Sequence, residues 1–371
     1  MQVQNYLRMQ YDLLGSVELA LAELTKEYAI KVRQYEEGLV VLNYSQILSP
    51  KSHPIVMECR GLILGAHKDF YVVSRSMDRF FKLGESPETQ THLDWSKATC
   101  SEKVDGSLIR IFFWNEQWHI ASRGMAFGEG SPNGFDITFR GLVLKALDVT
   151  DEEFQFNCDR ILHQDITYIC EITSVENRCV KAYTGYTLHY LAARDNHTFQ
   201  YMNCVEEAKL LGMSIPKQFS FSSAEDCKKI VESFTGLDEG VVVYMDGIPI
   251  AKIKSAAYCA VHLLRGEGLS PKRVSELVLT NEQEEYLIYF PEDRSFIQPY
   301  VDKLETILVD LAYAYILCKD IESQKDFAIA IKNVSGNSVL FYARKMKCDL
   351  HTAWQAQTDS FKLRVLMESM A

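Results

Sequence analysis

A change of hydrophobic period near residue 260 constrains the fold of this chain more than any other feature of its sequence. Between residues 36 and 254, short alternating or apolar runs follow one another, and turn residues separate several of them. This pattern is typical of strands joined by turns. After about residue 258, apolar residues recur at three- and four-residue spacing, which predicts helices. We therefore expect two domains, residues 1–260 and residues 261–371.

The first domain is predicted to be α+β, because helical segments interrupt the strands without a regular alternation of strand and helix. Its sheet is expected to be antiparallel. Helices are predicted at residues 17–33, 141–147 and 205–211. Strands are predicted at residues 39–42, 61–64, 71–74, 108–114, 119–122, 168–173, 187–192, 241–244 and 249–253. The second domain is predicted to be all-α, with helices in residues 271–280, 298–322 and 338–347.

No segment of the sequence is predicted to cross a membrane. The longest nearly apolar run, residues 307–318, contains Asp310, whereas a transmembrane helix needs about 20 apolar residues. The N-terminus lacks the basic and apolar stretches of a secretory signal. The ten cysteines are dispersed without C-x-x-C spacing, so we expect reduced thiols and little support for a zinc site. A cytoplasmic protein is expected, in the host cytoplasm if its source is a virus.

The acidic balance of the chain limits how it can bind nucleic acid. The formal net charge is -11 at pH 7, and non-specific binding to DNA or RNA depends on Lys and Arg side chains that neutralise phosphates. Any nucleic-acid site must therefore be local.

The segment SEKVDGS, residues 101–107, places Lys103 just before an Asp-Gly turn that opens an apolar strand. A lysine amine can act as a covalent nucleophile where burial or a nearby cation lowers its pKa. Asp105 and Gly106 suit a tight loop in which the backbone comes close to a ligand. Taken alone the pattern is weak, because a plain hairpin with an exposed lysine has the same residues.

Two other predicted strand regions carry ionisable side chains. Glu171 lies inside an otherwise apolar strand, where a carboxylate is costly unless it is paired, binds a metal or lines a cleft. Glu239 precedes a predicted hairpin whose second strand places Lys252 and Lys254 on one face, about 7 Å apart. Such a pair beside a carboxylate suits neighbouring phosphates. Two alternatives remain open: Glu171 could be a salt-bridged glutamate on an edge strand, and Lys252 and Lys254 could decorate a strand edge that faces solvent.

Arginines and aromatic residues lie upstream and downstream of Lys103. Arg60 stands at the start of a strand, residues 74–82 read SRSMDRFFK, and Arg123 follows the strand 119–122. Each arginine alone is typical of an ordinary surface. The order of one candidate nucleophile, two carboxylates on strands and several cations is what favours a functional site.

Together these segments resemble the covalent nucleotidyltransferase superfamily of ATP-dependent ligases and capping enzymes. KVDGS, ICEI, DEGVVVY and AKIKS match its motifs I, III, IV and V. In detail they resemble the T4-type RNA ligase 1 family, on ECRG from residue 58, SRSMDRFFK from residue 74, EITSVENR from residue 171 and KIKSAAY from residue 252. The resemblance covers roughly residues 44–262. It implies a nucleotidyltransferase domain with ATP-grasp-like antiparallel sheets and flanking helices.

The resemblance also implies an RNA ligase that uses ATP as co-substrate. Lys103 would attack the α-phosphorus and hold AMP, which then moves to an RNA 5′-phosphate before a 3′-hydroxyl attacks. Mg²⁺, or Mn²⁺ in its place, would be held mainly through water by Asp105, Glu171 and Glu239. The implied catalytic residues are Lys103, Asp105, Glu171, Glu239, Lys252 and Lys254.

Three positions depart from the family's SRPxxKFFN segment: Ser76 replaces the proline, Arg79 the lysine and Lys82 the asparagine. An arginine still binds a phosphate, in a planar bidentate manner instead of as a point charge. With Arg79 kept, the implied nucleotide-binding residues are Tyr44, Arg60, Arg79, Phe81, Gly106, Arg123 and Tyr258.

The predicted partner is RNA with 5′-phosphate and 3′-hydroxyl ends, in repair of tRNA or other single-stranded RNA, and the expected state is a monomer. DNA ligation and mRNA capping use the same lysine chemistry, but those families normally continue into a five-stranded barrel, unlike residues 261–371. An RNA-binding module without catalysis is the other alternative, and the six intact catalytic positions disfavour it. By analogy the helical domain selects the RNA, and residues 344–347 are interpreted as a solvated helix face rather than an RNA contact.

Overall fold

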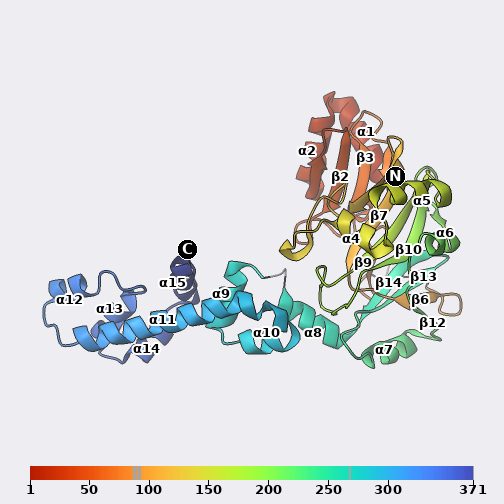
Figure 1. Ribbon diagram of the computed structural model, residues 1–371. Helices are drawn as coiled ribbons and strands as arrows, with labels where there is room; N and C mark the ends of the chain where they lie inside the picture. The colour runs from red at the N-terminus through yellow and green to blue at the C-terminus, as the bar shows by residue number, and fades with distance from the viewer. Residues whose placement is uncertain (87–89, 91–92, 267–268, 371) are drawn as a thin grey trace. The chain divides into compact units, whose positions relative to one another are not determined.

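The chain folds into two compact units, Met1–Ala260 and Val261–Ala371. The computed structural model describes residues 1–86, 90, 93–266 and 269–370. Figure 1 colours both units by residue number. Among these described residues, β-strands occur only in the N-terminal unit, which contains three sheets.

The first sheet of the N-terminal unit is antiparallel and is covered by helices. Its strands, in spatial order, are β1 (Ile30–Gln34), β2 (Leu39–Tyr44), β3 (Arg60–Gly65) and β4 (Val72–Ser74). The neighbouring helices are α1 (Gln2–Leu14), α2 (Val17–Tyr28) and α3 (Pro54–Glu58). Leu7 and Leu24 of the helices belong to the same buried cluster as Val40 and Leu64 of the sheet. Figure 1 shows α1 and α2 beside β2 and β3.

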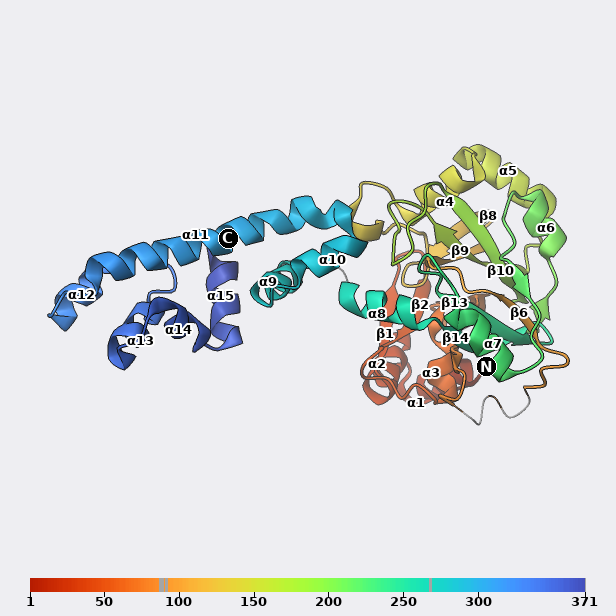
Figure 2. The same cartoon turned by 90° about the horizontal axis from the view of Figure 1, so that it is seen from below.

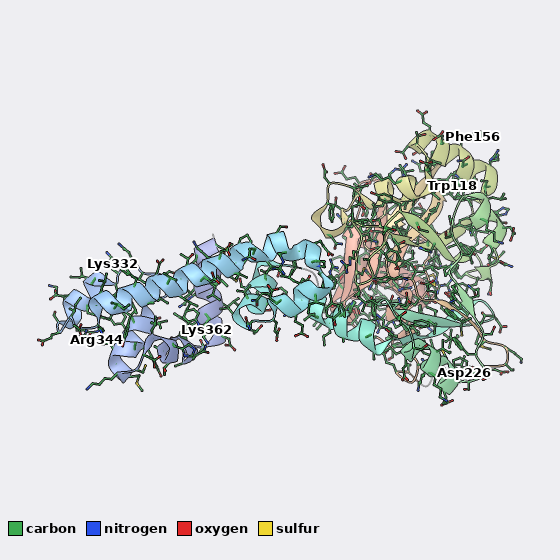
Figure 3. All side chains as sticks on the ribbon, turned by 60° about the horizontal axis from the view of Figure 1, so that its bottom comes forward. Trp118, Phe156, Asp226, Lys332, Arg344 and Lys362 are labelled. Atoms are coloured by element: carbon green, nitrogen blue, oxygen red, sulfur yellow. The ribbon has the colours of Figure 1, made fainter. Side chains whose placement is uncertain are left out.

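The second sheet carries Glu171 and packs under a layer of helices. Its strands, in spatial order, are β11 (Tyr201–Met202), β10 (Thr187–Asp195), β9 (Ile166–Thr173), β7 (Ser107–Trp114) and β8 (Gln117–Ser122). The helices are α4 (Phe139–Leu147), α5 (Asp151–Ile161) and α6 (Val205–Leu210). Trp118 of β8 is buried here and donates a hydrogen bond from its indole Nε1 to Asp159 of α5 at 2.8 Å. Figures 2 and 3 show α5 beside β8, with Trp118 labelled in Figure 3.

The third sheet carries Lys103, Glu239 and the two lysines of the last hairpin at or beside its strand ends. Its strands, in spatial order, are β12 (Gln218–Phe219), β6 (Thr99–Glu102), β13 (Gly240–Met245), β14 (Ile248–Lys254) and β5 (Phe81–Lys82). Helix α7 (Ala224–Glu232) packs on β14. Its buried residues Cys227 and Val231 belong to the same cluster as Val241 and Val243 of β13.

The predicted antiparallel α+β fold is confirmed, with one exception, and its strands form three sheets. Every pairing between named strands is antiparallel except that of β14 with β5. The turn between β13 and β14 has positive φ at both Asp246 (51°) and Gly247 (77°), as a two-residue type I′ hairpin requires. The turn pairs Met245 with Ile248, and a register shift between Val243 and Tyr244 then brings Lys254 opposite Gly240, next to Glu239.

The prediction of one helix over residues 17–33 is wrong at its C-terminal end. Helix α2 ends at Tyr28, and Ala29 adopts a left-handed conformation with φ 53° that stops it. The residues that follow form β1, in which the β-branched Ile30 is fully buried and Val32 is partly buried. Alternate burial in a strand therefore prevails over the helical spacing that the same apolar residues also satisfy.

The C-terminal unit is helical throughout its described elements, as predicted. It contains α9 (Pro271–Leu279), α10 (Gln283–Tyr289), α11 (Arg294–Cys318), α12 (Gln324–Ala330), α13 (Ser338–Met346), α14 (Leu350–Gln355) and α15 (Asp359–Met370), while α8 (Ala256–Arg265) begins before it. Leu277, Leu311 and Leu366 are fully buried where α9, α11 and α15 meet. Within the part of the chain that is described, no helix has both the length and the apolar character needed to cross a membrane.

Candidate active site

Lys103 follows β6 directly, and its amine contacts the carboxylate of Glu239. Lys103 Nζ lies 2.7 Å from Glu239 Oε2, and Lys254 Nζ lies 2.7 Å from Oε1 of the same carboxylate. The backbone N–H of Lys103 donates to the carbonyl of Gly240 at 2.9 Å. Pairing of β6 with β13 therefore places the candidate nucleophile beside the residue that precedes β13.

Burial and neighbouring charges have opposite effects on the pKa values of Lys103 and Glu239. Burial lowers the pKa of Lys103, but Glu239 and then Glu171 more than offset it, so that the pKa lies above its ordinary value. Burial likewise raises the pKa of Glu239, and Lys103 and Lys254 outweigh it, so that the pKa lies below its ordinary value. In the absence of a ligand, Glu239 is thus a carboxylate held between two ammonium groups.

Glu171 projects from β9 into the same cavity as Lys103. Burial raises its pKa to about 7, a shift that Lys103 reduces and Glu239 increases. Gly106 lies against it: a Cβ at Gly106 would fall 2.3 Å from the carbonyl oxygen of Ile172 and 3.1 Å from the Glu171 side chain. A glycine at this position therefore lets the loop after Lys103 approach β9.

Asp105 has different surroundings from Glu171 and Glu239. Its side chain is only 3% exposed. Oδ2 accepts hydrogen bonds from the backbone N–H groups of Val180 and Lys181, both at 2.8 Å, and Oδ1 accepts one from the hydroxyl of Tyr258 at 2.7 Å. Burial, with Glu239 and Asp105 next in effect, raises the pKa of Tyr258, which keeps this hydroxyl a donor. Asp105 thus ties the segment between β9 and β10 to the start of α8.

Lys252 and Lys254 project from the same face of β14 but serve different partners. Lys252 Nζ donates to the carbonyl of Phe80 at 3.3 Å and lies 5.3 Å from the centre of its ring. Burial, and then the charges of Lys103 and Arg60, lower the pKa of Lys252 to about 7. An anion near Lys252 would raise this pKa again and favour the charged form.

The arginines gather around Tyr44. Arg79 donates to the Tyr44 hydroxyl at 3.1 Å and stacks on the rings of Tyr44 (5.1 Å) and Phe81 (4.9 Å). The central carbon of the Arg123 guanidinium, Cζ, lies 4.8 Å from the centre of the Tyr44 ring. Burial raises the pKa of Tyr44, but Arg123, Arg60 and Arg79 outweigh it and bring the pKa below its ordinary value.

Two buried N–H groups of these arginines have no hydrogen-bond partner among the described residues: Nη1 of Arg60 and Nε of Arg79. A buried donor without an acceptor costs free energy. Both guanidinium groups are therefore ready to accept an anionic ligand such as a phosphate.

A cavity of about 420 Å³ contains part of the predicted set. Five of the predicted residues line it: Arg60, Lys103, Gly106, Arg123 and Glu171. The other predicted residues stand outside its wall: Tyr44, Arg79, Phe81, Asp105, Glu239, Lys252, Lys254 and Tyr258. Glu239, Lys252 and Lys254 still lie next to it, through the contacts of Glu239 with Lys103 and of Lys252 with Phe80, another lining residue.

The sequence analysis did not identify Lys181, which connects the segments that carry Lys103, Glu239 and Asp105. Lys181 Nζ lies 2.5 Å from Asp238 and 3.5 Å from Glu102, the residues directly before Glu239 and Lys103. Its backbone N–H is one of the donors to Asp105. No spacing in the sequence points to Lys181, because the segment that carries it has neither strand nor helix periodicity. Tyr183, whose hydroxyl accepts from the backbone N–H of Asp105 at 3.4 Å, was missed for the same reason.

The segment at residues 344–347 contains one structural residue. Arg344, labelled in Figure 3, donates to the carbonyl oxygens of Ile321 and Glu322 and stacks on the ring of Phe327 at 4.6 Å. Its guanidinium thus fastens the turn after α11, which was not expected from a solvated face.

Comparisons with known proteins show the family to which this chain belongs. A family model described as RNA ligase matches residues 58–258. The chain belongs to this T4-type RNA ligase family. Of the predicted site residues, Tyr44 alone lies outside the matched range.

Two relatives are similar over long stretches. A putative bifunctional polynucleotide kinase/RNA ligase of Autographa californica nuclear polyhedrosis virus is 33% identical over 357 residues, covering 92% of this chain and 51% of the viral protein. A putative RNA ligase of Thermovibrio ammonificans is 27% identical over 259 residues, covering 67% of this chain and 64% of that protein. The chain thus spans about half to two thirds of the length of these curated relatives.

Among solved structures, an archaeal ATP-dependent RNA ligase is 16% identical, with a TM-score of 0.47 and 82% of each chain covered. A mutant of Naegleria gruberi RNA ligase with ATP and Mn is 13% identical, with a TM-score of 0.39, 51% of this chain and 57% of the other covered.

Proposed function

We propose that this chain is an ATP-dependent RNA ligase that joins 5′-phosphate and 3′-hydroxyl ends through AMP bound covalently to Lys103. The observation that carries the proposal is the position of Lys103, in a cavity that Arg60 and Arg123 also line, with its amine on Glu239. A lysine nucleophile, a carboxylate and fixed cations around one cavity are what attack on a phosphate anhydride needs.

In the first step, the lone pair of Lys103 Nζ attacks the α-phosphorus of ATP. An N–P bond forms, the bond from the α-phosphorus to the bridging oxygen breaks, and pyrophosphate leaves with that electron pair. The ammonium of Lys103 must first lose a proton to water, because its contact with Glu239 keeps the pKa raised. Positive charge brought into the cavity favours that loss, since a nearby cation lowers the pKa of an amine.

Cations on two sides of the cavity hold the phosphates in this proposal. Lys252 and Lys254 face the α-phosphate, and Lys252 becomes fully charged when an anion arrives because its pKa is about 7 without one. Arg60 and Arg79 take the remaining phosphates with their unpartnered N–H groups. The tail of the nucleotide is therefore drawn toward the arginines stacked on Tyr44 and Phe81.

The other predicted residues shape the nucleotide site in this proposal. Arg123 lies near the sugar, with its guanidinium fixed by Asn43 Oδ1 at 3.2 Å. Gly106 lets the loop after Lys103 approach β9 closely. The hydrogen bond from the Tyr258 hydroxyl to Asp105 holds the same loop in place.

The acidic residues fit Mg²⁺, or Mn²⁺ in its place, through water only. Within the described ranges no three His, Cys, Asp or Glu side chains are grouped so as to ligate a metal directly. Asp105 and Glu239 are already occupied by hydrogen bonds and ion pairs. Magnesium usually keeps several of its waters, and Glu171, with Glu239 and Asp105 behind it, would hold that water shell. The ion would supply positive charge that favours the neutral amine and offsets the charge of the α-phosphate.

Two transfers complete the proposed reaction. An oxygen of the RNA 5′-phosphate attacks the α-phosphorus, the bond to Lys103 Nζ breaks, and the amine regains a proton. The 3′-hydroxyl then loses its proton to water, its oxygen forms a bond to the 5′-phosphorus, and the bond from that phosphorus to the bridging oxygen breaks, so that AMP leaves with the electron pair. We place this reaction in repair of broken tRNA or other single-stranded RNA by a cytoplasmic monomer, with the C-terminal unit selecting the RNA. The pairing of ligase with polynucleotide kinase in the name of the viral relative supports such a role.

Transfer of label from ATP to the protein tests the first step. ATP labelled at the α-phosphate is incubated with the protein and Mg²⁺, and label is measured on the denatured protein. We expect label on the unmodified chain and on Lys97→Ala, a control at an exposed lysine, but not on Lys103→Ala. Added pyrophosphate should release it. Label on Lys103→Ala, or no label on the unmodified chain with ATP, contradicts the proposal.

A further inference from the structure

A second cavity, of about 610 Å³, lies next to the cavity of Lys103. The two cavities share the side chains of Leu191 in β10 and Tyr244 in β13. Both lie between the second and the third sheet, since their walls come from β10 on one side and from β6 and β13 on the other. Leu191 and Tyr244 are therefore a partition between two spaces within one cleft.

The two cavities differ in charge. Cationic and acidic side chains line the first, among them Arg60, Lys103 and Glu171. Of the described residues that line the second, Asp246 alone has a charged side chain, and the others are aromatic, aliphatic or neutral polar groups such as Tyr201 and Gln218. The second cavity therefore suits a neutral group and gives a phosphate no partner.

The register of β13 sets the direction from the charged end to the partition. Glu102 pairs with Val241, and Thr99 pairs with Tyr244, so the partition lies roughly 10 Å along the strand from the level of Glu102. A nucleotide whose phosphates occupy the cationic end extends its base toward the partition. Because the sugar is attached at N9, the edge of adenine that carries N6 and C2 is the edge that faces Leu191 and Tyr244.

A local irregularity of β10 places one side of the partition. In β10, Tyr190 pairs with Cys170 and Ala192 with Ile169, so that Leu191 is an extra residue in a β-bulge. A bulge re-aims a side chain that a regular strand would direct elsewhere. Tyr244, by contrast, keeps its regular pairing with Thr99 of β6. A bulged strand and a regular strand thus meet at the same wall.

We propose that Leu191 and Tyr244 set the size limit for the nucleotide base, and that the second cavity binds a neutral apolar group attached to the N6 or C2 edge of adenine once this partition is shortened. The ligand class is an adenosine triphosphate that carries such a group. This inference rests on the proposed function, because the nucleotide enters as the substrate of Lys103.

Labelling of the protein with two nucleotides tests the partition. The nucleotides are ATP and N6-benzyl-ATP, each labelled at the α-phosphate, and the measured quantity is kcat/KM for label bound to the denatured protein. We expect Leu191→Ala to raise the ratio of N6-benzyl-ATP to ATP at least about tenfold, since removal of a few buried carbons changes discrimination on that scale. Tyr244→Ala should raise the same ratio.

Two control variants separate the partition from a general enlargement. Leu108 lines only the first cavity, so Leu108→Ala should leave the ratio unchanged. Asn203 is exposed and lines only the second cavity, so adding Asn203→Trp to Leu191→Ala should fill the space and reverse the gain. An equal gain in Leu108→Ala, or a gain that survives Asn203→Trp, overturns the inference.

The failure of this inference differs from a failure of the proposed function. If the unmodified chain takes no label from ATP, the proposed function is wrong. If it takes label from ATP while neither truncated variant changes the ratio, only the partition is wrong. Loss of labelling with ATP in both truncated variants also overturns the inference, because the two side chains would then be required by adenine itself.

Discussion

The surroundings of Glu239 and of Asp105 form two contrasting regions of the N-terminal unit. Around Glu239, two ammonium groups lie 2.7 Å from one carboxylate. Around Asp105, two backbone N–H groups and a tyrosine hydroxyl occupy the carboxylate. Both residues were expected to serve the same metal. From this contrast we propose that Glu239 acts on the charges of the reaction, whereas Asp105 mainly holds the loop of Lys103 in place.

The largest effect is expected from Glu239→Ala. The variant leaves Lys103 and Lys254 without the carboxylate that orients both amines, and loss of one such group in a preorganised site costs about 100- to 1000-fold in rate. Single-turnover labelling from α-labelled ATP measures it. Glu206→Ala, at an exposed carboxylate that pairs with Lys209 on α6, should retain full activity. Less than tenfold loss in Glu239→Ala would remove the distinction between the two regions.

Asp105→Ala should affect stability more than Glu239→Ala affects it. Truncation leaves the buried N–H of Val180, the partly buried N–H of Lys181 and the Tyr258 hydroxyl without their acceptor, at a cost of about 1–3 kcal/mol for each buried group left unsatisfied. Urea unfolding measures the loss of unfolding free energy. Tyr258→Phe removes one of the three contacts and should lose about 1 kcal/mol. An Asp105→Ala protein as stable as the unmodified chain contradicts a positioning role.

Lys181 joins the two regions, so its replacement should give an intermediate effect. Lys181→Ala should lower kcat for labelling about tenfold without changing KM for ATP, because misplacement of reacting groups costs rate rather than binding. Lys181→Arg should recover part of the rate, since it keeps the charge between Asp238 and Glu102. A change in KM alone would instead place Lys181 in nucleotide binding. Lys209→Ala, at an exposed lysine on α6, is the matched control.

The smallest effect is a pH dependence of stability from Lys252. Its pKa is about 7 in the folded chain against 10.5 for the free side chain. Between these values the unfolded state binds more protons, so the contribution of Lys252 to stability rises with pH across that window. Lys252→Met should therefore be more stable than the unmodified chain at pH 7 and below. That advantage should shrink by pH 10 in urea unfolding, and a constant difference contradicts the lowered pKa.

The sequence predicted the fold class because strand and helix periods separate near residue 260. It failed where one segment satisfies two periods, as at residues 30–33, which continue the helical spacing of α2 but form β1. It also missed α1 and α5, although α5 begins with a complete capping box at Thr150 and Glu153.

The candidate site was predictable only in part for a physical reason. Period two on β14 correctly placed Lys252 and Lys254 on one face, but it does not reveal that one meets Phe80 and the other Glu239. Those partners depend on how β5 and β13 flank the strand. Contacts made by a segment without regular structure, such as that of Lys181 with Asp238, follow from the tertiary fold alone.

Mass spectrometry of the protein after incubation with ATP and Mg²⁺ shows whether AMP is bound to Lys103. The chain is digested under conditions that preserve a phosphoramidate, and the peptides are searched for the added mass of AMP. We expect AMP on Lys103 in the unmodified chain and in Asp105→Asn, and its near absence in Glu239→Ala. AMP on Lys252 or Lys254, or on no lysine, would contradict it.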